Sequence, residues 1–348
     1  MLRLCCGMWF LAFISVISSA QDFTLLLNSL PSYRPRRQVS GTIRIWGHRN
    51  QPHDFTEGLV KRWEESFRKY QPEVTFETQL RGNASAIGGL YTMAADVAFM
   101  SREIWPIETD GFEQGLGYKP FSVEVATGSL ANPNQDFALV IFVHRDNPLS
   151  RMTLAQLDAI FGADHRRGLK SISVWGDLGL RGEWEDKPVD LYGFAIDSDF
   201  SQFFEQAVLN GSRKWNCKLR EFTDTKNPDG SGLDAGRQIL DALAKDRYGI
   251  AISGLAYGNA SVKPIAIGSD KGGPYYLATP GTLIDRKYPL ARTPYLFVRR
   301  APGQPIDPKI DEFLHFVLSR EGQEAVIRDG GYLPLNGDAV RRQREKLQ

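Results

Sequence analysis

Strand-like and helix-like patterns of apolar residues alternate along the first part of this 348-residue chain. Residues 42–46 alternate in the manner of a half-buried strand, and residues 58–70 place Trp63 and Phe67 among apolar positions at helical spacing. The same order then returns as a strand at 73–80, a small-residue helix at 85–95 and a short buried strand at 96–100. Alternating strands and helices predict a largely parallel, doubly wound sheet.

The second part of the chain continues this alternation. Apolar strands are predicted at 137–143, 189–194, 248–255 and 288–300. Helices are predicted at 153–161, with Thr153 as N-cap, at 198–209, at 232–246, and as an amphipathic pair within 307–330. The charged tail after residue 338 is typical of a solvated helix end, and no internal repeat of fixed period is present.

The N-terminal twenty residues have the pattern of a secretory signal. Arg3 precedes an apolar stretch that ends in Ser-Ser-Ala, which predicts cleavage after Ala20. A membrane anchor is the alternative, although the apolar stretch is short for a bilayer span. Residues 21–40, with two prolines and three arginines in 31–40, are expected to form an irregular, exposed leader.

Composition narrows the function classes. The chain has 42 Lys and Arg against 41 Asp and Glu, so loss of Arg3 leaves a formally neutral mature protein. Neutrality argues against the broad basic surface that nucleic acid requires. Cys217 would be the one cysteine left after cleavage, and we interpret it as structural because no partnered histidine can be placed beside it. The length and the hydrophobic content of 42% allow two domains with separate cores.

Five stretches in register reveal a resemblance to a known family. They are "VHRDNPLSRMTLAQLDAIF", "WGDLGLRGEW", "YGIAISGLAYG", "YPLARTPYLFVRR" and "LSREGQEAVIRDGGYLPL". Together they resemble the periplasmic phosphate-binding subunits of bacterial ABC importers, in order from about Gly41 to about Asn336.

The resemblance implies a fold and a function. The fold would be two doubly wound α/β lobes of the type II periplasmic-binding-protein kind, joined by two crossing strands, with a ligand cleft between them. Lobe 1 would comprise residues 41–143 and 290–348, and lobe 2 residues 144–289. The protein would act in the periplasm or outside the cell as a monomer without cofactor or metal, capturing phosphate or a related oxyanion for a membrane permease.

Two loops fit the donor pattern of that family. Helix N-termini offer backbone N–H groups to a tetrahedral oxyanion, and hydroxyl and arginine side chains complete the site. Ser101 and Arg102 follow the buried strand 96–100, where the serine would bind the anion and the arginine would either join it or brace the loop. A solvated turn is the alternative. Upstream, a second Gly-rich helix start could present N–H groups from Gly82, Asn83, Ala84 and Ser85.

Two further loops depart from the family pattern. After the first strand the chain has His48, Arg49 and Asn50 where small hydroxyl residues are usual, and these side chains could still bind an anion. His48 and His53 lack a third ligand, so no metal site is predicted.

At the helix start near residue 198, Ser198 and Ser201 flank Asp199, which stands where a glycine is expected. That carboxylate would either cap the helix or accept a hydrogen bond from a protonated ligand.

Other function classes remain open. A binding module of the same fold could report its ligand to a sensor instead of a permease. A hydrolase is a weaker alternative, because the chain contains no GxSxG elbow, no HExxH motif and no carboxylate pair with an assignable acid and base. No catalytic residue is predicted.

Overall fold

The computed structural model describes residues 23–48, 55–132, 137–269 and 272–348. The chain forms two compact units. Unit 1 contains the chain up to Thr127 and resumes at Thr293–Gln348, whereas unit 2 is the continuous segment Gly128–Arg292. The predicted signal peptide, residues 1–20, lies outside the described residues.

The sheet of unit 1 has five strands in the order β2-β1-β3-β15-β4. β1 (Gly41–Gly47) pairs in parallel with both β2 (Val74–Leu80) and β3 (Val97–Met100). β15 (Tyr295–Val298) runs antiparallel to β3 and to the edge strand β4 (Phe121–Glu124). The predicted parallel sheet is therefore completed by an antiparallel strand from the far end of the chain.

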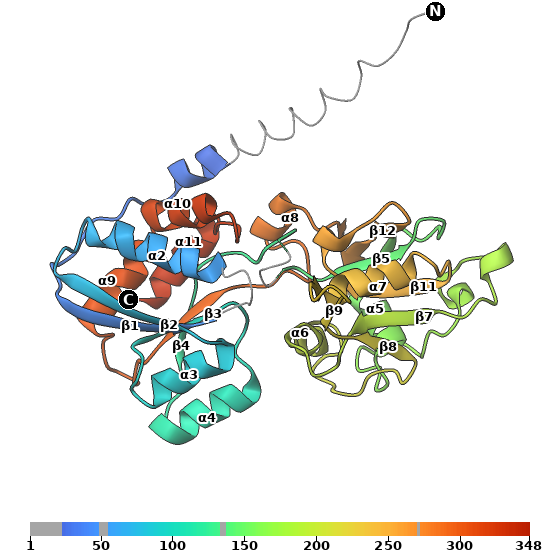
Figure 1. Cartoon of the computed structure of the whole chain (residues 1–348), viewed down its shortest axis with the longest axis horizontal. Coiled ribbons are helices and arrows are strands. Elements are labelled where there is room, and N and C mark those ends of the chain that lie inside the picture. The colour runs from blue at the N-terminus through green and yellow to red at the C-terminus, as the bar shows by residue number, and fades with distance from the viewer. Residues whose placement is uncertain (1–22, 49–54, 133–136, 270–271) are drawn as a thin grey trace, which may run out of the picture. The chain divides into compact units, whose positions relative to one another are not determined.

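Helices cover both faces of this sheet (Figure 1). α2 (Phe55–Arg68), α9 (Pro308–Val317), α10 (Arg320–Asp329) and α11 (Gly337–Lys346) pack on one face, and their core includes Trp63, Phe67, Phe99, Phe313 and Phe316. α3 (Asn83–Tyr91) and α4 (Pro106–Leu116) cover the other face through a smaller cluster. Burial on both faces explains why β3 is apolar at every position.

Unit 2 repeats this arrangement with different strands. Its main sheet has the order β12-β5-β11-β7-β8. The strands are β5 (Val140–His144), β7 (Asp190–Phe194), β8 (Leu219–Phe222), β11 (Gly249–Ser253) and β12 (Val262–Pro264). β7 pairs in parallel with β8 and β11, and β5 runs antiparallel to β11 and β12. Each sheet thus joins three parallel strands to an antiparallel strand that lies next to a crossing between the units.

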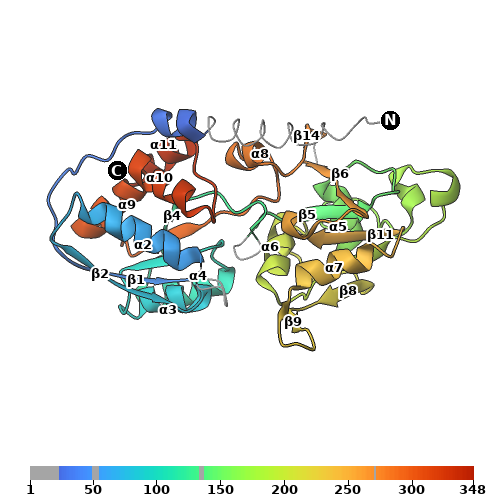
Figure 2. The same ribbon diagram turned by 45° about the horizontal axis from the view of Figure 1, so that its top comes forward.

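The remaining elements of unit 2 surround its sheet (Figures 1 and 2). The helices are α5 (Leu154–Phe161), α6 (Asp199–Ala207), α7 (Ala235–Leu243), α8 (Pro280–Ile284) and three 3₁₀ turns, Trp175–Leu178, Gly182–Trp184 and Leu255–Tyr257. β6 (Arg151–Thr153), β13 (Ala266–Gly268) and β14 (Tyr275–Tyr276) form a three-stranded sheet, and β9 (Thr225–Lys226) pairs with β10 (Gly232–Leu233). Thr153 caps α5 as predicted, accepting a hydrogen bond from Gln156 N at 3.1 Å.

The unit boundaries differ from the lobe boundaries expected from the sequence. The strand predicted at 137–143 was expected at the end of lobe 1, but β5 pairs with β11 and β12 inside unit 2. The return to unit 1 comes after Arg292 instead of after residue 289. Apolar runs identify strands without showing which sheet they join, and this is the physical reason for the difference.

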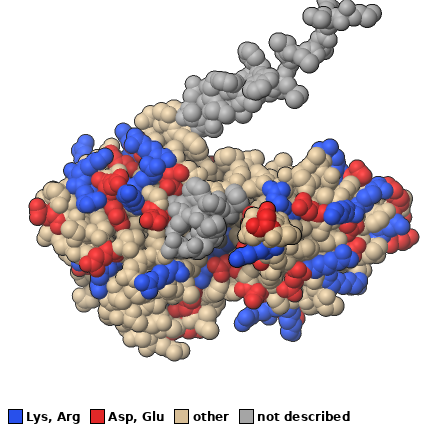
Figure 3. Space-filling model, viewed as in Figure 1, with Lys and Arg blue, Asp and Glu red and all other residues tan. Residues whose placement is uncertain are grey.

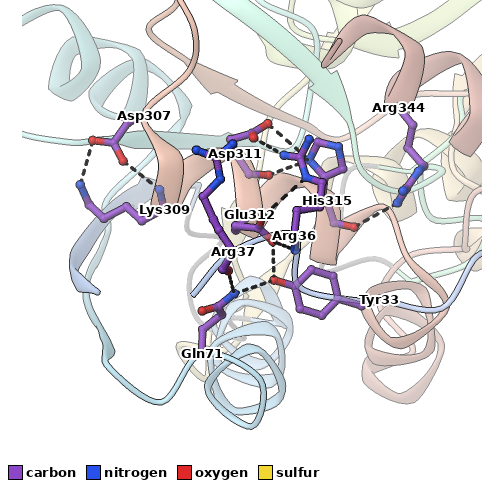
Figure 4. A network of polar contacts seen from close by, with 10 residues as sticks. All are labelled: Tyr33, Arg36, Arg37, Gln71, Asp307, Lys309, Asp311, Glu312, His315 and Arg344. Atoms are coloured by element: carbon purple, nitrogen blue, oxygen red, sulfur yellow. Dashed lines mark hydrogen bonds and ion pairs between the residues drawn. The ribbon is translucent and has the colours of Figure 1, made fainter. Parts of the chain in front are cut away.

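The described leader differs in part from the irregular, exposed segment expected: it begins as a helix and buries two side chains, whereas residues 30–40 are irregular and most residues of the leader are exposed. Residues 23–29 are helical, and the side chains of Leu30 and Tyr33 are only 3% and 5% exposed. Figure 4 shows how polar groups fix the following segment to unit 1. The Tyr33 hydroxyl donates to Glu312 Oε2 at 2.9 Å and accepts from Gln71 Nε2 at 3.1 Å. Burial and the hydrogen bond to the Glu312 carboxylate raise the pKa of Tyr33, although the bond from Gln71 lowers it.

Arg36 supplies a second attachment for the leader. Its guanidinium forms an ion pair with Asp311 on α9 and lies 3.5 Å from Glu312 Oε1. Burial would raise the pKa of Asp311, but the interactions with His315 and Arg36 lower it below its ordinary value. One of the three arginines that suggested an exposed segment, Arg36, is therefore held by carboxylates of α9.

Candidate functional site

Three strand ends converge at one edge of the unit 1 sheet. β1, β2 and β3 are parallel, so their carboxyl ends lie together. The backbone N–H of His48 donates to Phe99 O at 2.9 Å, and Gly82 N donates to Gly47 O at 3.1 Å. Three of the predicted donor loops therefore meet at a single place.

The Asn83 side chain connects two of these loops. Its Oδ1 accepts a hydrogen bond from Ser101 N at 3.0 Å, and its Nδ2 donates to Ser101 Oγ at 3.2 Å. Asn83 is 6% exposed and Ser101 is fully buried. The Ser101 hydroxyl belongs to a buried polar pair and not to a solvated turn.

α3 begins directly beside this pair. Its N-cap is Gly82, whose φ of 138° is readily adopted only by glycine and whose missing side chain leaves the helix without a side-chain cap. The first N–H groups of a helix have no acceptor within the helix. The N-terminus of α3, with Asn83, Ala84 and Ser85 in its first turn, therefore carries the partial positive charge that attracts an anion. The Ser85 hydroxyl donates to Gly82 O at 2.8 Å.

Arg102 is held by its own loop. Its Nη1 and Nη2 donate to the two carboxylate oxygens of Glu108 at 2.8 and 2.7 Å, and Nη1 also donates to Glu103 O. The guanidinium stacks 3.6 Å from the centre of the Trp105 ring and is 1% exposed. These contacts favour the bracing role over direct anion binding, because a bidentate carboxylate already occupies the face that an oxyanion would use.

Glu108 and Trp105 are site-supporting residues that the sequence analysis missed. Glu108 Oε2 also accepts from Trp105 N at 2.9 Å, which closes the first turn of α4. Pro106, in the first turn of that helix, followed two residues later by a glutamate, is a recognisable helix start, so this signal was present in the sequence.

The predicted donor loop of unit 2 is organised as a helix cap. Ser198 is the N-cap of α6 and accepts from Ser201 N at 3.2 Å, while the Ser201 hydroxyl donates to Phe194 O at 3.2 Å. Ser201 is 3% exposed, and Asp199 occupies the first turn. Both serine hydroxyls thus make contacts within unit 2.

The first predicted loop is only partly described. The Nε2 atom of His48 is buried and has no hydrogen-bond partner among the described residues. Arg49, Asn50 and His53 lie outside the described residues. Within the described part of the chain, no group of three or more His, Cys, Asp or Glu residues is arranged to hold a metal ion.

Charges of both signs are mixed on the surface shown in Figure 3. Over α2 and α10, a groove is lined by Arg62, Lys69 and Arg328 together with Glu65, Glu321 and Glu324. This mixture agrees with the near-zero formal charge and gives no broad basic face there. Among the described helices, none combines the length and the apolar character that crossing a bilayer requires.

Comparisons with known proteins agree with this architecture. A family model described as PBP superfamily domain matches residues 53–321. Phosphate-binding protein PstS of Pseudomonas aeruginosa is 32% identical over 321 residues, which cover 92% of this chain and 91% of that protein. Protein SphX of Synechococcus elongatus is 22% identical over 280 residues, covering 79% of this chain and 73% of that protein.

Solved structures show the same fold. PstS from Borrelia burgdorferi aligns with a TM-score of 0.56 at 15% identity, covering 85% of this chain and 100% of that chain. An ABC-type phosphate transport receptor from Vibrio cholerae aligns with a TM-score of 0.52 at 17% identity, covering 84% of this chain and 100% of that chain. Taken with the two similar sheets and their crossings, these matches show that the chain belongs to the PBP superfamily.

Proposed function

We propose that this protein is an exported solute-binding protein that captures phosphate or a closely related oxyanion and delivers it to the permease of an ABC importer. The observation that carries the proposal is the convergence at unit 1, where the uncapped N-terminus of α3 lies beside the buried Asn83–Ser101 pair. Oriented N–H groups and a fixed hydroxyl suit a dehydrated tetrahedral anion.

Each of the converging residues has a part in this proposal. Gly82, Ala84 and Ser85 supply the helix start, Ser101 supplies the hydroxyl, and Asn83 holds the serine in place. Arg102 braces the loop through Glu108. The relatives whose names describe a phosphate-binding protein and a phosphate transport receptor support the choice of ligand.

Asp199 gives the proposal a specificity element. A carboxylate at the start of α6 repels a fully ionised anion but accepts a hydrogen bond from a protonated one. Phosphate retains a proton at neutral pH and sulfate does not. If Asp199 accepts this hydrogen bond, Asp199→Gly should let sulfate compete with phosphate. If Asp199 only caps α6, the same change should leave phosphate affinity unchanged or improve it.

Export and partner follow from the same proposal. The pattern of residues 1–20 fits a cleaved secretory signal, which supports a mature protein in the periplasm or outside the cell. There it would dock on a membrane permease as a monomer. N-terminal sequencing of the secreted protein should find Gln21, and an intact Met1 on the soluble form would contradict cleavage.

Calorimetry of the mature chain tests the ligand. Phosphate, arsenate, sulfate, phosphonates and small carboxylates would be titrated separately into protein freed of bound anion by dialysis. Binding of phosphate and arsenate, with little heat from sulfate or carboxylates, is the expected result. Tight binding of a carboxylate with none of phosphate would overturn the choice of ligand, and turnover of a phosphate ester would favour the hydrolase alternative.

A further inference from the structure

The two crossings between the units lie side by side. Val125 N donates to Pro294 O at 3.1 Å in unit 1, and Gly128 N donates to Arg292 O at 2.8 Å in unit 2. A Cβ atom at Gly128 would lie 2.7 Å from Arg292 O and 3.3 Å from Arg292 Cβ, which is too close. The approach of the two crossings therefore requires glycine at position 128.

Each side of this crossing region is anchored within its own unit. Thr127 exchanges backbone hydrogen bonds with Leu333 at 2.7 and 3.0 Å, and its hydroxyl donates to Pro334 O at 3.2 Å. On the unit 2 side, the guanidinium of Arg292 lies 5.3 Å from the ring centres of both Phe200 and Phe203. The backbone on each side of the crossings is thereby fixed by contacts within its own unit.

The Arg292 contact reaches the helix of the predicted donor loop. Phe200 and Phe203 lie on α6, whose N-cap is Ser198. Phe200 also stacks on Phe137 and Phe194 with ring centres 4.5 and 4.7 Å apart. Arg292 is completely buried. A guanidinium removed from water over two aromatic faces is held in a defined orientation.

We propose that Arg292 is a positioning residue that couples the crossing backbone to α6, so that anion binding at the α6 N-terminus depends on this contact. This inference rests on the proposed function for the identity of the ligand. The contact itself does not depend on the ligand, since it joins groups within unit 2.

The experiment compares phosphate binding by the mature protein and five variants, one of which combines Arg292→Met with Phe203→Leu. Arg292→Met keeps the length and apolar stem but removes the charge, Arg292→Lys restores a charge, and Phe203→Leu removes one ring face. Arg220→Met is the control for loss of an exposed cation–π contact, because Arg220 is exposed on a strand of the same unit and lies 5.3 Å from the ring of Tyr192.

We expect Arg292→Met and Phe203→Leu each to weaken phosphate binding about tenfold, or about 1.4 kcal/mol, which lies within the range of a desolvated cation–π contact. The double variant should be little weaker than either single one, and Arg292→Lys should recover part of the affinity. Arg220→Met should bind as the parent does. If Arg292 served only in packing, its substitution would lower the urea midpoint of the ligand-free protein, and the effects of the two substitutions on phosphate affinity would be additive.

Two results would overturn the proposal. One is parent affinity in Phe203→Leu, which remains informative even where Arg292→Met fails to fold. The other is full additivity of the two substitutions. If the parent does not bind phosphate, the proposed ligand is wrong, but hydrogen exchange of the ligand-free protein still tests the coupling between Arg292 and α6. Arg292→Met should speed exchange of the amides at 199–203. Unchanged exchange would refute the coupling.

Discussion

Asn83 joins two loops that are 18 residues apart in the sequence. Its amide satisfies both the backbone N–H and the hydroxyl of Ser101, and both residues are buried. A buried polar group that loses its partner destabilises the fold by about 1–3 kcal/mol. Any change at Ser101 therefore affects the stability of the fold as well as the affinity for the proposed ligand.

Ser101→Ala should lower both phosphate affinity and the stability of the fold. We expect the dissociation constant for phosphate to rise about ten- to a hundredfold, because a hydrogen bond to a charged ligand contributes about 1.5–3 kcal/mol. The free energy of unfolding should fall by about 1–3 kcal/mol, since Asn83 Nδ2 loses its acceptor. Calorimetry and urea denaturation measure the two effects.

Ser319→Ala is the control for burial. Ser319 is also fully buried in unit 1 and caps α10, so its loss should lower stability by about 1 kcal/mol and leave phosphate affinity unchanged. Equal affinity in the Ser101→Ala variant and the parent would remove Ser101 from the site.

Residue-level prediction from the sequence was uneven for a physical reason. The position of Ser101 after a buried strand could be inferred from periodicity. The commitment of Arg102 to Glu108 could not, because it depends on how α4 turns back toward the loop. The burial of Ser101 likewise depends on Asn83 reaching it across the sheet edge.

At the scale of elements, the leader behaves as part of unit 1. Tyr33→Phe removes the hydroxyl that donates to the fully buried Glu312 carboxylate. We expect the free energy of unfolding to fall by about 1.5–3 kcal/mol, as for other hydrogen bonds to charged groups. Tyr70→Phe is the control, because the Tyr70 ring packs edge-on against Tyr33 but its hydroxyl makes none of these bonds. Equal stability of the two variants in urea would argue against the anchoring role.

A second element-level prediction concerns pH. Asp329 is the last residue of α10, and its side chain is only 5% exposed. Its Oδ1 atom lies 3.8 Å from Nε of Arg62 on α2. Burial raises its pKa from 3.8 to about 6, against smaller opposing effects of the Gly331 backbone and Arg62. A carboxyl with a raised pKa holds its proton more tightly in the folded state, so it lowers stability as pH rises from about 4 to about 6.

Asp329→Asn removes this dependence. Relative to the parent, the variant should gain about 2–3 kcal/mol of stability between about pH 4 and about pH 7, since one pKa unit corresponds to about 1.4 kcal/mol. Urea denaturation of parent and variant at both pH values measures the gain. Comparing the stability difference between variant and parent at the two pH values cancels any pH-independent effect of the amide. A difference that stays constant with pH would show that Asp329 does not titrate in this range.

Element prediction succeeded wherever a local pattern decides the structure. The helices around Trp63 and Thr153 and the all-buried strand β3 were evident from periodicity and capping. The attachment of the leader at Tyr33 and Arg36 was missed because its arginines and prolines signal exposure, whereas the carboxylates that bind these two residues lie more than 270 residues away. Long-range charge pairing leaves no local pattern to read.

At the scale of the whole molecule, the two sheets have the same plan. Three parallel strands are followed by an antiparallel strand, β15 in unit 1 and β5 in unit 2, and each of these lies next to a crossing. Periodicity predicted the alternation and most strands of the two sheets, but not β4, β8 or β12. Their assignment to units required pairing between residues far apart in the chain, which is why β5 was expected in the other lobe.

A two-unit binding protein should be stabilised by its ligand through mass action alone. Binding to the folded state adds about 2.7 kcal/mol at a hundredfold excess of ligand over the dissociation constant and about 4.1 kcal/mol at a thousandfold excess. The melting temperature of the mature chain should therefore rise by several degrees and continue to rise with the logarithm of phosphate concentration. Scanning calorimetry across a phosphate series measures this, with sulfate at equal ionic strength as the control for general salt effects. The rise should begin at higher phosphate concentration in Ser101→Ala than in the parent, because the dissociation constant sets the onset. If the melting temperature of the parent responds equally to phosphate and sulfate, the stabilisation is a general salt effect and not the result of binding at a site.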